Sequence, residues 1–272
     1  MKARLLVSAV GVPFLLVVLI VLPPWGTMAL CAVLSALAAH ELLCAVGTAE
    51  KRRLLCLGVL FAAAVPVIVY FWGASLVLRA VLGGMAFIAF LDLLFTRGTE
   101  RASSFLDVCA LLFSSALLPL AFSCLLALRL DETGGRLLVL APLFAAFLSD
   151  TGAFFAGRFF GRHKLAPLIS PNKTVEGAVG GLLGGIVGML IFGALCRLFL
   201  KLTPPWAAMA AWGVIGSIFG QIGDLSFSAI KREYDIKDFG KLLPGHGGVL
   251  DRFDSVLFVA PVLLLLTEVF PL

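Results

Sequence analysis

The sequence predicts an all-α integral membrane protein, a polytopic helical bundle of about nine transmembrane helices with a cytoplasmic N-terminus. Hydrophobic residues make up 61% of the 272 residues, charged residues make up 14%, and the mean hydropathy is +1.09. Soluble domains carry roughly 25% charged residues, so a soluble protein with a large core is excluded. The apolar runs are continuous and do not alternate with polar residues, which favours helices over a β-barrel.

Nine apolar segments are long enough to span a bilayer, which takes roughly 20 helical residues. They lie at about 5–22, 25–47, 54–72, 76–95, 105–128, 137–160, 175–200, 205–230 and 255–272. The connections are short, so we expect one polytopic domain over 1–272. In it, the helices of 1–130 precede the helices and cytoplasmic loops of 131–272 that carry the site. The six cysteines are scattered without a CxxC pair, and we expect reduced, apolar side chains and no zinc site.

The basic residues predict the orientation. With the N-terminus inside, sixteen of the 21 lysines and arginines fall on the cytoplasmic side and five fall outside. This asymmetry follows the positive-inside rule and supports an odd number of spans. We interpret the basic clusters at 51–53 and 97–101 as topology signals alone. The predicted location is the cell membrane, with several spans and a site that faces the cytoplasm.

Four acids lie inside predicted spans, each in the cytoplasmic half: Glu41, Asp92, Asp150 and Asp224. An ionisable group in a span is unfavourable and is therefore a functional candidate. Four acids at a similar depth suggest a cavity that opens to the cytoplasm. For Glu41 and Asp92, snorkelling to the interface or pairing with a neighbouring arginine explains the acid equally well.

The eighth span carries a polar stripe toward the cytoplasm. At 100° per residue, one face roughly 100° wide collects Gln221, Asp224, Ser228, Lys231 and Arg232. The opposite face is apolar. A stripe that runs from the membrane interior to two adjacent cations suits an anionic substrate that enters from the cytoplasm.

The loop after this span contains Lys237, Asp238 and Lys241, and it continues into "LLPGHGGVLDRFDS" at 242–255. Pro244 and Gly245 indicate a turn. Gly247 and Gly248 allow the backbone to approach a ligand closely. We favour a site role for His246, either on a phosphate or in ordering the loop.

Two acids of this stretch, Asp251 and Asp254, flank Arg252 and share a face where the last helix begins. Their position also suits the positive end of a helix, which is the simpler explanation. Together with Asp224, their carboxylates have the oxygen ligands that a hard cation such as Mg²⁺ prefers.

A second polar stretch, at 149–177, contains Asp150 and four basic residues that complement phosphate: Arg158, Arg162, Lys164 and Lys173. Its "SPNKT" segment is expected to form a turn into a helix, with Thr174 as N-cap followed by Glu176. That helix N-terminus can receive a phosphate. A basic loop on lipid headgroups is the alternative.

The seventh span presents two ridges of glycine, which predict close helix packing. One ridge is Gly177, Gly181 and Gly185, and the other is Gly180, Gly184 and Gly188.

The stretch "SAIKREYDIKDFGKLLPGHGGVLDRFD" at 228–254 resembles the signature of the phosphatidate cytidylyltransferase family. That signature reads S-x-apolar-K-R, then K-D, then H-G-G-apolar-x-D-R-x-D. The stretch at 149–177 is similar to a second family motif, in which a tyrosine is expected near Phe154. The motifs cover roughly the last half of the chain.

The resemblance implies that CTP and phosphatidic acid react to give CDP-diacylglycerol and pyrophosphate. It implies Mg²⁺ with Asp224 and Asp251 as ligands, and a second cation is left open. The expected catalytic residues are Asp224, Lys231, Arg232 and Asp251. The expected substrate contacts are Asp150, Arg158, Lys173, Ser228, Lys237, Asp238, His246, Gly247, Gly248, Arg252 and Asp254. We expect a lipid bilayer around the protein, no nucleic-acid partner, and a homodimer through the glycine-rich helix faces as one arrangement.

Two other functions stay open on the sequence alone. A CTP-dependent lipid kinase of the polyprenol type would release CDP and a lipid phosphate. A cation-coupled transporter would use buried carboxylates without nucleotide chemistry, although transporters often contain internal repeats and the sequence shows no convincing one.

Overall fold

The computed structural model describes residues 2–48, 51–99, 102–132, 134–242 and 247–270, and within these ranges it leaves out the side chains of 2–8 and 74–82. The chain divides into two compact units, which we describe separately. Unit 1 comprises Met1–Leu126 and Tyr234–Arg252, and unit 2 comprises Ala127–Glu233 and Phe253–Leu272.

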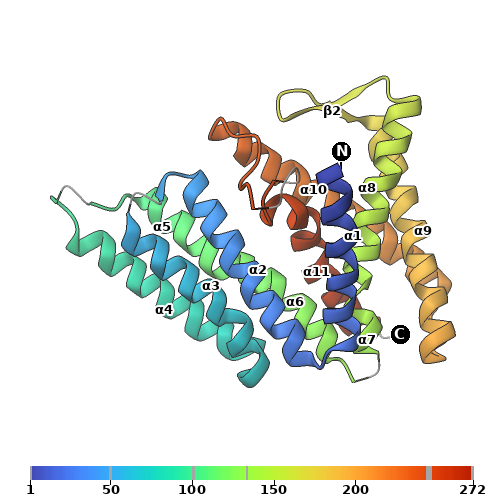
Figure 1. Cartoon of the computed structure of the whole chain (residues 1–272), viewed down its shortest axis with the longest axis horizontal. Helices are drawn as coiled ribbons and strands as arrows, with labels where there is room; N and C mark the ends of the chain where they lie inside the picture. Colours follow the sequence, from blue (N-terminus) through green and yellow to red (C-terminus); the bar gives the residue numbers. More distant parts are fainter. Residues whose placement is uncertain (1, 49–50, 100–101, 133, 243–246, 271–272) are drawn as a thin grey trace. The chain divides into compact units, whose positions relative to one another are not determined.

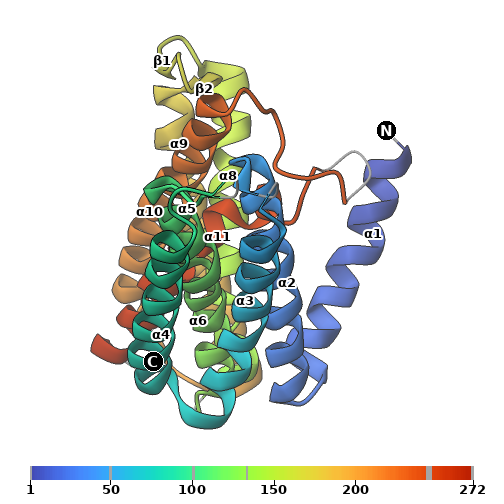
Figure 2. The same ribbon diagram turned by 90° about the vertical axis from the view of Figure 1, so that its left-hand side faces the viewer.

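Unit 1 is built from the N-terminal helices. They are α1 (Lys2–Leu16), which continues into the π-helical turn η1 (Val17–Val21), then α2 (Pro24–Ala45), α3 (Arg52–Trp72), α4 (Ala74–Phe95), α5 (Phe105–Leu112), the π-helical turn η3 (Phe113–Leu117) and most of α6 (Leu118–Leu130). Helices α2 to α5 lie side by side in this unit (Figures 1 and 2). The loop from Tyr234 and the first residues of α11 (Leu250–Val269) complete it.

Unit 2 consists of three long helices, a hairpin and the rest of α11. Its elements are α7 (Gly135–Leu138), α8 (Ala141–Phe160), β1 (Lys164–Ala166), β2 (Ser170–Thr174), α9 (Val175–Leu200) and α10 (Trp206–Glu233). The strands are antiparallel, with Lys164 opposite Thr174 and Ala166 opposite Ser170. Figure 2 shows this hairpin beyond the end of α9. The turn predicted for "SPNKT" was therefore wrong, because these residues form strand β2.

The predicted class, an all-α polytopic membrane protein, is confirmed. Among the described residues, six helical stretches are long and apolar enough to cross a membrane: Pro24–Ala45, Arg52–Trp72, Phe105–Leu130, Gly135–Phe160, Val175–Leu200 and Trp206–Glu233. The other three predicted spans also coincide with helices, namely α1 with η1, α4 and α11. The total of nine spans and the cytoplasmic N-terminus stay predictions.

The glycines of α9 allow neighbouring helices to approach at backbone distance, as predicted. A β-carbon added at Gly152 of α8 would lie 2.5 Å from the carbonyl oxygen of Gly180 and 3.0 Å from the α-carbon of Gly184. On the α10 side, a β-carbon at Gly213 would lie 2.6 Å from the carbonyl oxygen of Gly185. Helices α8 and α10 of the same chain therefore cover both glycine ridges.

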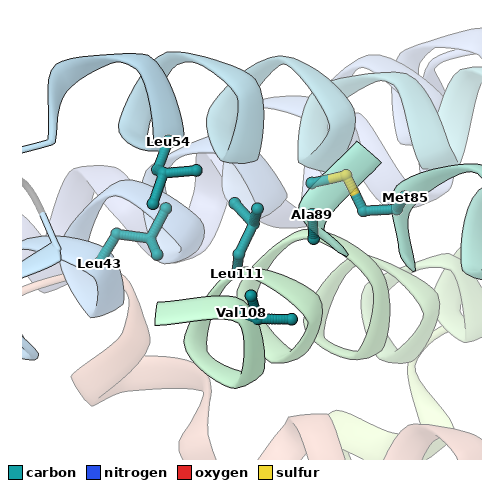
Figure 3. Close-up of a cluster of buried hydrophobic side chains, with 6 residues drawn as sticks. All are labelled: Leu43, Leu54, Met85, Ala89, Val108 and Leu111. Atoms are coloured by element: carbon teal, nitrogen blue, oxygen red, sulfur yellow. The ribbon is translucent and has the colours of Figure 1, made fainter. Parts of the chain in front are cut away.

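The core of unit 1 joins four helices through close apolar contacts. Figure 3 shows six buried side chains of this core, from α2, α3, α4 and α5: Leu43, Leu54, Met85, Ala89, Val108 and Leu111. Between membrane helices, van der Waals packing of this kind drives association, so this cluster joins α2 to α5 into one unit.

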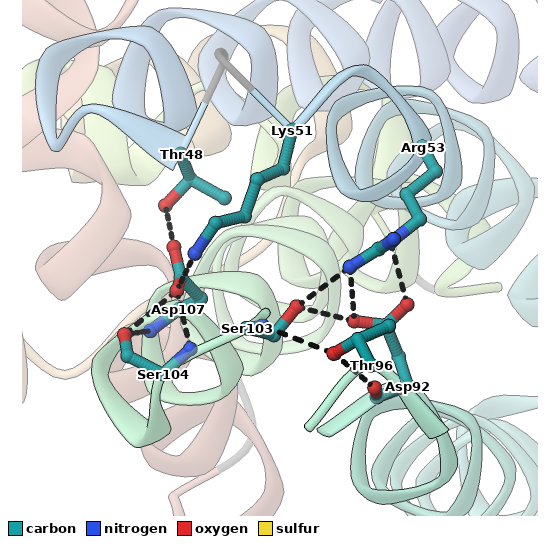
Figure 4. Close-up of polar contacts among 8 residues, drawn as sticks. All are labelled: Thr48, Lys51, Arg53, Asp92, Thr96, Ser103, Ser104 and Asp107. Carbon is teal, nitrogen blue, oxygen red and sulfur yellow. Dashed lines mark hydrogen bonds and ion pairs between the residues drawn. The ribbon is translucent and has the colours of Figure 1, made fainter. Parts of the chain in front are cut away.

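Ion pairs near the ends of these helices use residues of the first basic cluster (Figure 4). Lys51 Nζ lies 2.5 Å from Asp107 Oδ2, and Arg53 Nε lies 2.7 Å from Asp92 Oδ1. Ser103 Oγ donates to Asp92 Oδ2 at 2.5 Å. Pairing with an arginine is thus the correct explanation for Asp92. The interpretation of residues 51–53 as topology signals alone was wrong, because two of them hold helices together.

Candidate active site

Unit 2 contains a cavity of about 580 Å³ between α8, the hairpin, α9 and α10. Its lining combines carboxylates, cations and amides with apolar side chains. The lining residues are Asp150, Ala153, Phe154, Gly157, Arg158, Leu165, Asn172, Lys173, Thr174, Gly177, Ala178, Gln221, Asp224 and Leu225. A cavity with both charge signs can hold an anionic substrate together with a cation.

Two of the lining residues form an ion pair. Lys173 Nζ is 2.6 Å from Asp224 Oδ2, and both side chains are partly exposed. Ser228 Oγ donates to the other carboxylate oxygen, Asp224 Oδ1, at 3.3 Å. Asp150 and Asp254 are close enough for their charges to interact with that of Asp224. The structure therefore brings three of the predicted acids within electrostatic range of one another, and Lys173 pairs with one of them, Asp224.

The N-terminus of α9 faces the same cavity through Thr174 and Gly177. Thr174 Oγ1 accepts from Gly177 N at 3.1 Å, which confirms the predicted N-cap. The positive end of the helix dipole and the Arg158 guanidinium in the lining both favour a bound anion.

Glu176 holds the base of the hairpin against α9. Its carboxylate accepts from the backbone N–H groups of Arg162 at 3.0 Å and His163 at 3.2 Å. His163 Nδ1 also lies 2.6 Å from Glu176 Oε1. Glu176 therefore helps to place the hairpin residues that line the cavity.

The polar stripe of α10 serves several roles. Gln221 lines the cavity, and its Nε2 donates to the carbonyl oxygen of Ala178 at 3.1 Å. Lys231 interacts electrostatically with Asp254. Arg232 Nε donates to the carbonyl oxygen of Ile169 at 3.1 Å and so contacts the hairpin. The predicted stripe thus points toward the cavity and the elements that border it.

In unit 1, Asp251 bonds the backbone at Phe239 and Gly248. Its side chain is buried, and Oδ2 accepts from Phe239 N at 2.8 Å and from Gly248 N at 3.0 Å. Gly247 has a φ of +82°, in the left-handed region that favours glycine. Lys237, Asp238 and Arg252 are exposed. His246 lies outside the described residues, as do Pro244 and Gly245.

The donor chemistry of the unit 2 cavity suits a hard divalent cation, because Asp150, Asp224 and the nearby Asp254 present carboxylate oxygens. In the part of the chain that the structure describes, no three histidine, cysteine or acidic side chains already have the arrangement of a metal site. Asp224 is instead held by Lys173. Asp251, the other predicted ligand, belongs to unit 1. The two-aspartate metal assignment stays a prediction.

A family model described as the cytidylyltransferase family matches residues 2–270, so the chain belongs to that family. Three relatives named phosphatidate cytidylyltransferase support this membership. The protein of Staphylococcus haemolyticus is 38% identical over 192 residues, which cover 71% of this chain and 70% of the relative. That of Staphylococcus saprophyticus is 41% identical over 175 residues, 64% of this chain and 65% of the relative. That of Bacillus subtilis is 38% identical over 184 residues, 68% of this chain and 67% of the relative.

Asn172 and Glu41 have a place in these arrangements, although neither was among the expected catalytic residues or substrate contacts. Asn172 lines the cavity from strand β2, and its only signal is a polar side chain within a basic segment. Glu41 accepts hydrogen bonds from the backbone N–H groups of Val249 and Leu250. An acid inside an apolar span marks Glu41 in the sequence, but nothing there identifies its partner.

Proposed function

We propose that this protein transfers the CMP moiety of CTP to phosphatidic acid, giving CDP-diacylglycerol and pyrophosphate. Membership of the cytidylyltransferase family and the names of the relatives support this reaction. The observation that carries it is the unit 2 cavity, where Arg158, Lys173 and the start of α9 can bind phosphate beside Asp150 and Asp224.

The reaction needs charge neutralisation more than proton transfer. A phosphate oxygen of phosphatidic acid attacks the α-phosphorus of CTP, a new P–O bond forms, and the bond to the leaving pyrophosphate breaks. The second pKa of a phosphomonoester is about 6, so the attacking oxygen is already anionic near neutral pH. Positioning and electrostatic stabilisation therefore account for catalysis, as in other phosphoryl transfers.

The proposed roles follow from the placement of the side chains. Lys173 and Arg158 line the cavity and bind phosphate oxygens, and Ser228 orients Asp224 through its hydroxyl. Lys231 and Arg232, at the end of α10, neutralise charge on phosphates that arrive from the cytoplasm. Lys237, Asp238, His246, Gly247, Gly248 and Arg252 keep their proposed roles as substrate contacts of the signature loop.

Asp224 and Asp251 are the proposed ligands of Mg²⁺, and the charges of Asp150 and Asp254, which interact with that of Asp224, would add to the attraction for a cation. A bound divalent cation would supply positive charge to the phosphates of two anionic substrates.

The test is to incubate the purified protein with CTP, phosphatidic acid and Mg²⁺ and to identify the products. We expect CDP-diacylglycerol and pyrophosphate in equal amounts. Lipid phosphate and CDP from a polyprenol would instead identify the kinase. Ion uptake into vesicles without any nucleotide product would identify the transporter.

We also propose that the site faces the cytoplasm of the cell membrane. The basic-residue asymmetry supports this orientation. In a variant whose six cysteines are replaced, Lys164→Cys and Lys241→Cys should react only with reagents that enter the cytoplasm. Glu132→Cys, in a loop predicted outside, is the matched control and should react from outside intact cells. Labelling of Lys164→Cys or Lys241→Cys from outside would contradict the orientation.

The glycine ridges of α9 cannot serve as the predicted homodimer face. Helices α8 and α10 of the same chain already cover those glycines.

A further inference from the structure

Glu41 of α2 caps the N-terminus of α11 from a distant part of the chain. Its carboxylate is buried, with 6% of the residue exposed. Oε1 accepts from Val249 N at 2.9 Å, and Oε2 accepts from Leu250 N at 2.9 Å. The first N–H groups of a helix have no acceptor within the helix, and its positive end favours a negative charge. A side chain 208 residues away from Val249 therefore satisfies two of these donors at once.

Two glycines make room for this carboxylate. A β-carbon at Gly240 would lie 2.5 Å from Glu41 Oε1. A β-carbon at Gly248 would collide with the same carboxylate, at Oε2. Their surroundings thus explain why glycine stands at both positions, one of them within the "HGG" triplet.

A second carboxylate, that of Asp251 in the first turn of α11, bonds the neighbouring backbone. Asp251 Oδ2 accepts from Phe239 N and Gly248 N. Glu41 and Asp251 together accept four backbone N–H groups of unit 1, from residues 239, 248, 249 and 250. Hydrogen bonds to an ionised acceptor are roughly twice as strong as neutral ones, so the backbone around Gly248 is held tightly on both sides.

We propose that Glu41 is a positioning residue, which fixes the backbone of Val249 and Leu250 at the start of α11 and so holds Asp251 in the orientation needed for nucleotidyl transfer. The inference deepens the proposed function, because Gly248 and Asp251 belong to its expected site. Hydrogen bonding to the start of α11, and not snorkelling or arginine pairing, explains the acid at position 41.

The test is Glu41→Gln, with Glu268→Gln as the matched control. Glutamine keeps the size of the side chain, but its NH₂ group cannot accept from a backbone N–H. We expect amide hydrogen exchange at Val249 and Leu250 to become roughly 10- to 100-fold faster, while exchange in α3 is unchanged. Glu268 is exposed on α11, so its change to glutamine should alter neither exchange nor turnover.

Kinetic measurements distinguish a positioning role of Glu41 from a general effect on the stability of unit 1. In Glu41→Gln we expect kcat to fall roughly 10-fold or more, with the KM for CTP within about threefold of wild type, because the cavity cations Arg158 and Lys173 are retained. Wild-type exchange at Val249 and Leu250, or faster exchange throughout unit 1, would overturn the proposal. The exchange measurement needs no substrate. An inactive wild-type protein would therefore count against the proposed function alone.

A second pair of variants tests the contact directly. Gly240→Ala should displace the Glu41 carboxylate and reproduce the faster exchange at Val249 and Leu250. In a Glu41→Ala background the same change should add little, since residues that act through one contact are not additive. Equal effects of Gly240→Ala in both backgrounds would contradict the inferred contact.

Discussion

Asp224→Asn is expected to lose nearly all nucleotidyl transfer while the protein inserts and folds normally. The carboxylate lines the cavity and pairs with Lys173 at 2.6 Å. Asparagine keeps the shape but removes the charge that a divalent cation needs between two anionic substrates. We expect kcat to fall by roughly 100-fold or more, the loss typical of removing one preorganised electrostatic group. The rate of product formation from CTP and phosphatidic acid measures this fall in kcat.

Asp235→Asn is the matched control for this substitution. Asp235 is exposed and has a φ of +52°, which asparagine tolerates well, so turnover should stay at the wild-type level. Normal membrane insertion of both variants shows that the loss is chemical. Near wild-type turnover of Asp224→Asn at ordinary Mg²⁺ would disprove its assigned role, and with it our interpretation of the α10 stripe.

Removal of divalent metal is expected to have an effect of similar size. The cavity contains Asp150 and Asp224 beside the cations that bind phosphate. Without a metal, these carboxylates would repel the phosphates of both substrates. Treatment with EDTA should therefore reduce turnover to background, and added Mg²⁺ or Mn²⁺ should restore it, because carboxylate oxygens prefer hard cations.

The control for chelation is a measurement that shows whether the protein stays folded. Far-UV circular dichroism should stay unchanged in EDTA, because the described helices are held by apolar packing and ion pairs such as Arg53–Asp92. Recovery of activity after re-addition then identifies a catalytic metal. Full turnover in a preparation free of divalent metal would refute the carboxylate-metal assignment.

The helices were predictable because a continuous apolar run of roughly 20 residues marks each of them in the sequence. All nine apolar segments coincide with helices, and the glycine ridges of α9 pack against neighbouring helices as their spacing indicates. The hairpin was not predictable. Strand β2 contains a proline and lasts five residues, so no alternation of apolar and polar residues reveals it. Glu176, expected next to the N-cap, instead bonds the backbone at the hairpin base.

The candidate site was predictable where its residues share one helix or one motif. Asp224 and Ser228 are four residues apart on α10, and their hydrogen bond follows from helical spacing. The Lys173–Asp224 pair and the contacts of Glu41 join segments that are far apart in the chain. Such partners depend on how helices pack, which no local pattern encodes.

The contact between Glu41 and the start of α11 has a consequence for biosynthesis. Helix α2 leaves the ribosome more than 200 residues before Val249 and Leu250 do. Until then its carboxylate has none of the donors that later surround it, although insertion of an acid at mid-span costs roughly 3 kcal/mol and less near a span end. Through most of its synthesis, the nascent protein therefore contains a carboxylate whose burial is not yet offset by hydrogen bonds. The contact of Glu41 with Val249 and Leu250 forms only when nearly the whole chain has been made, so a chain that stops before α11 lacks it.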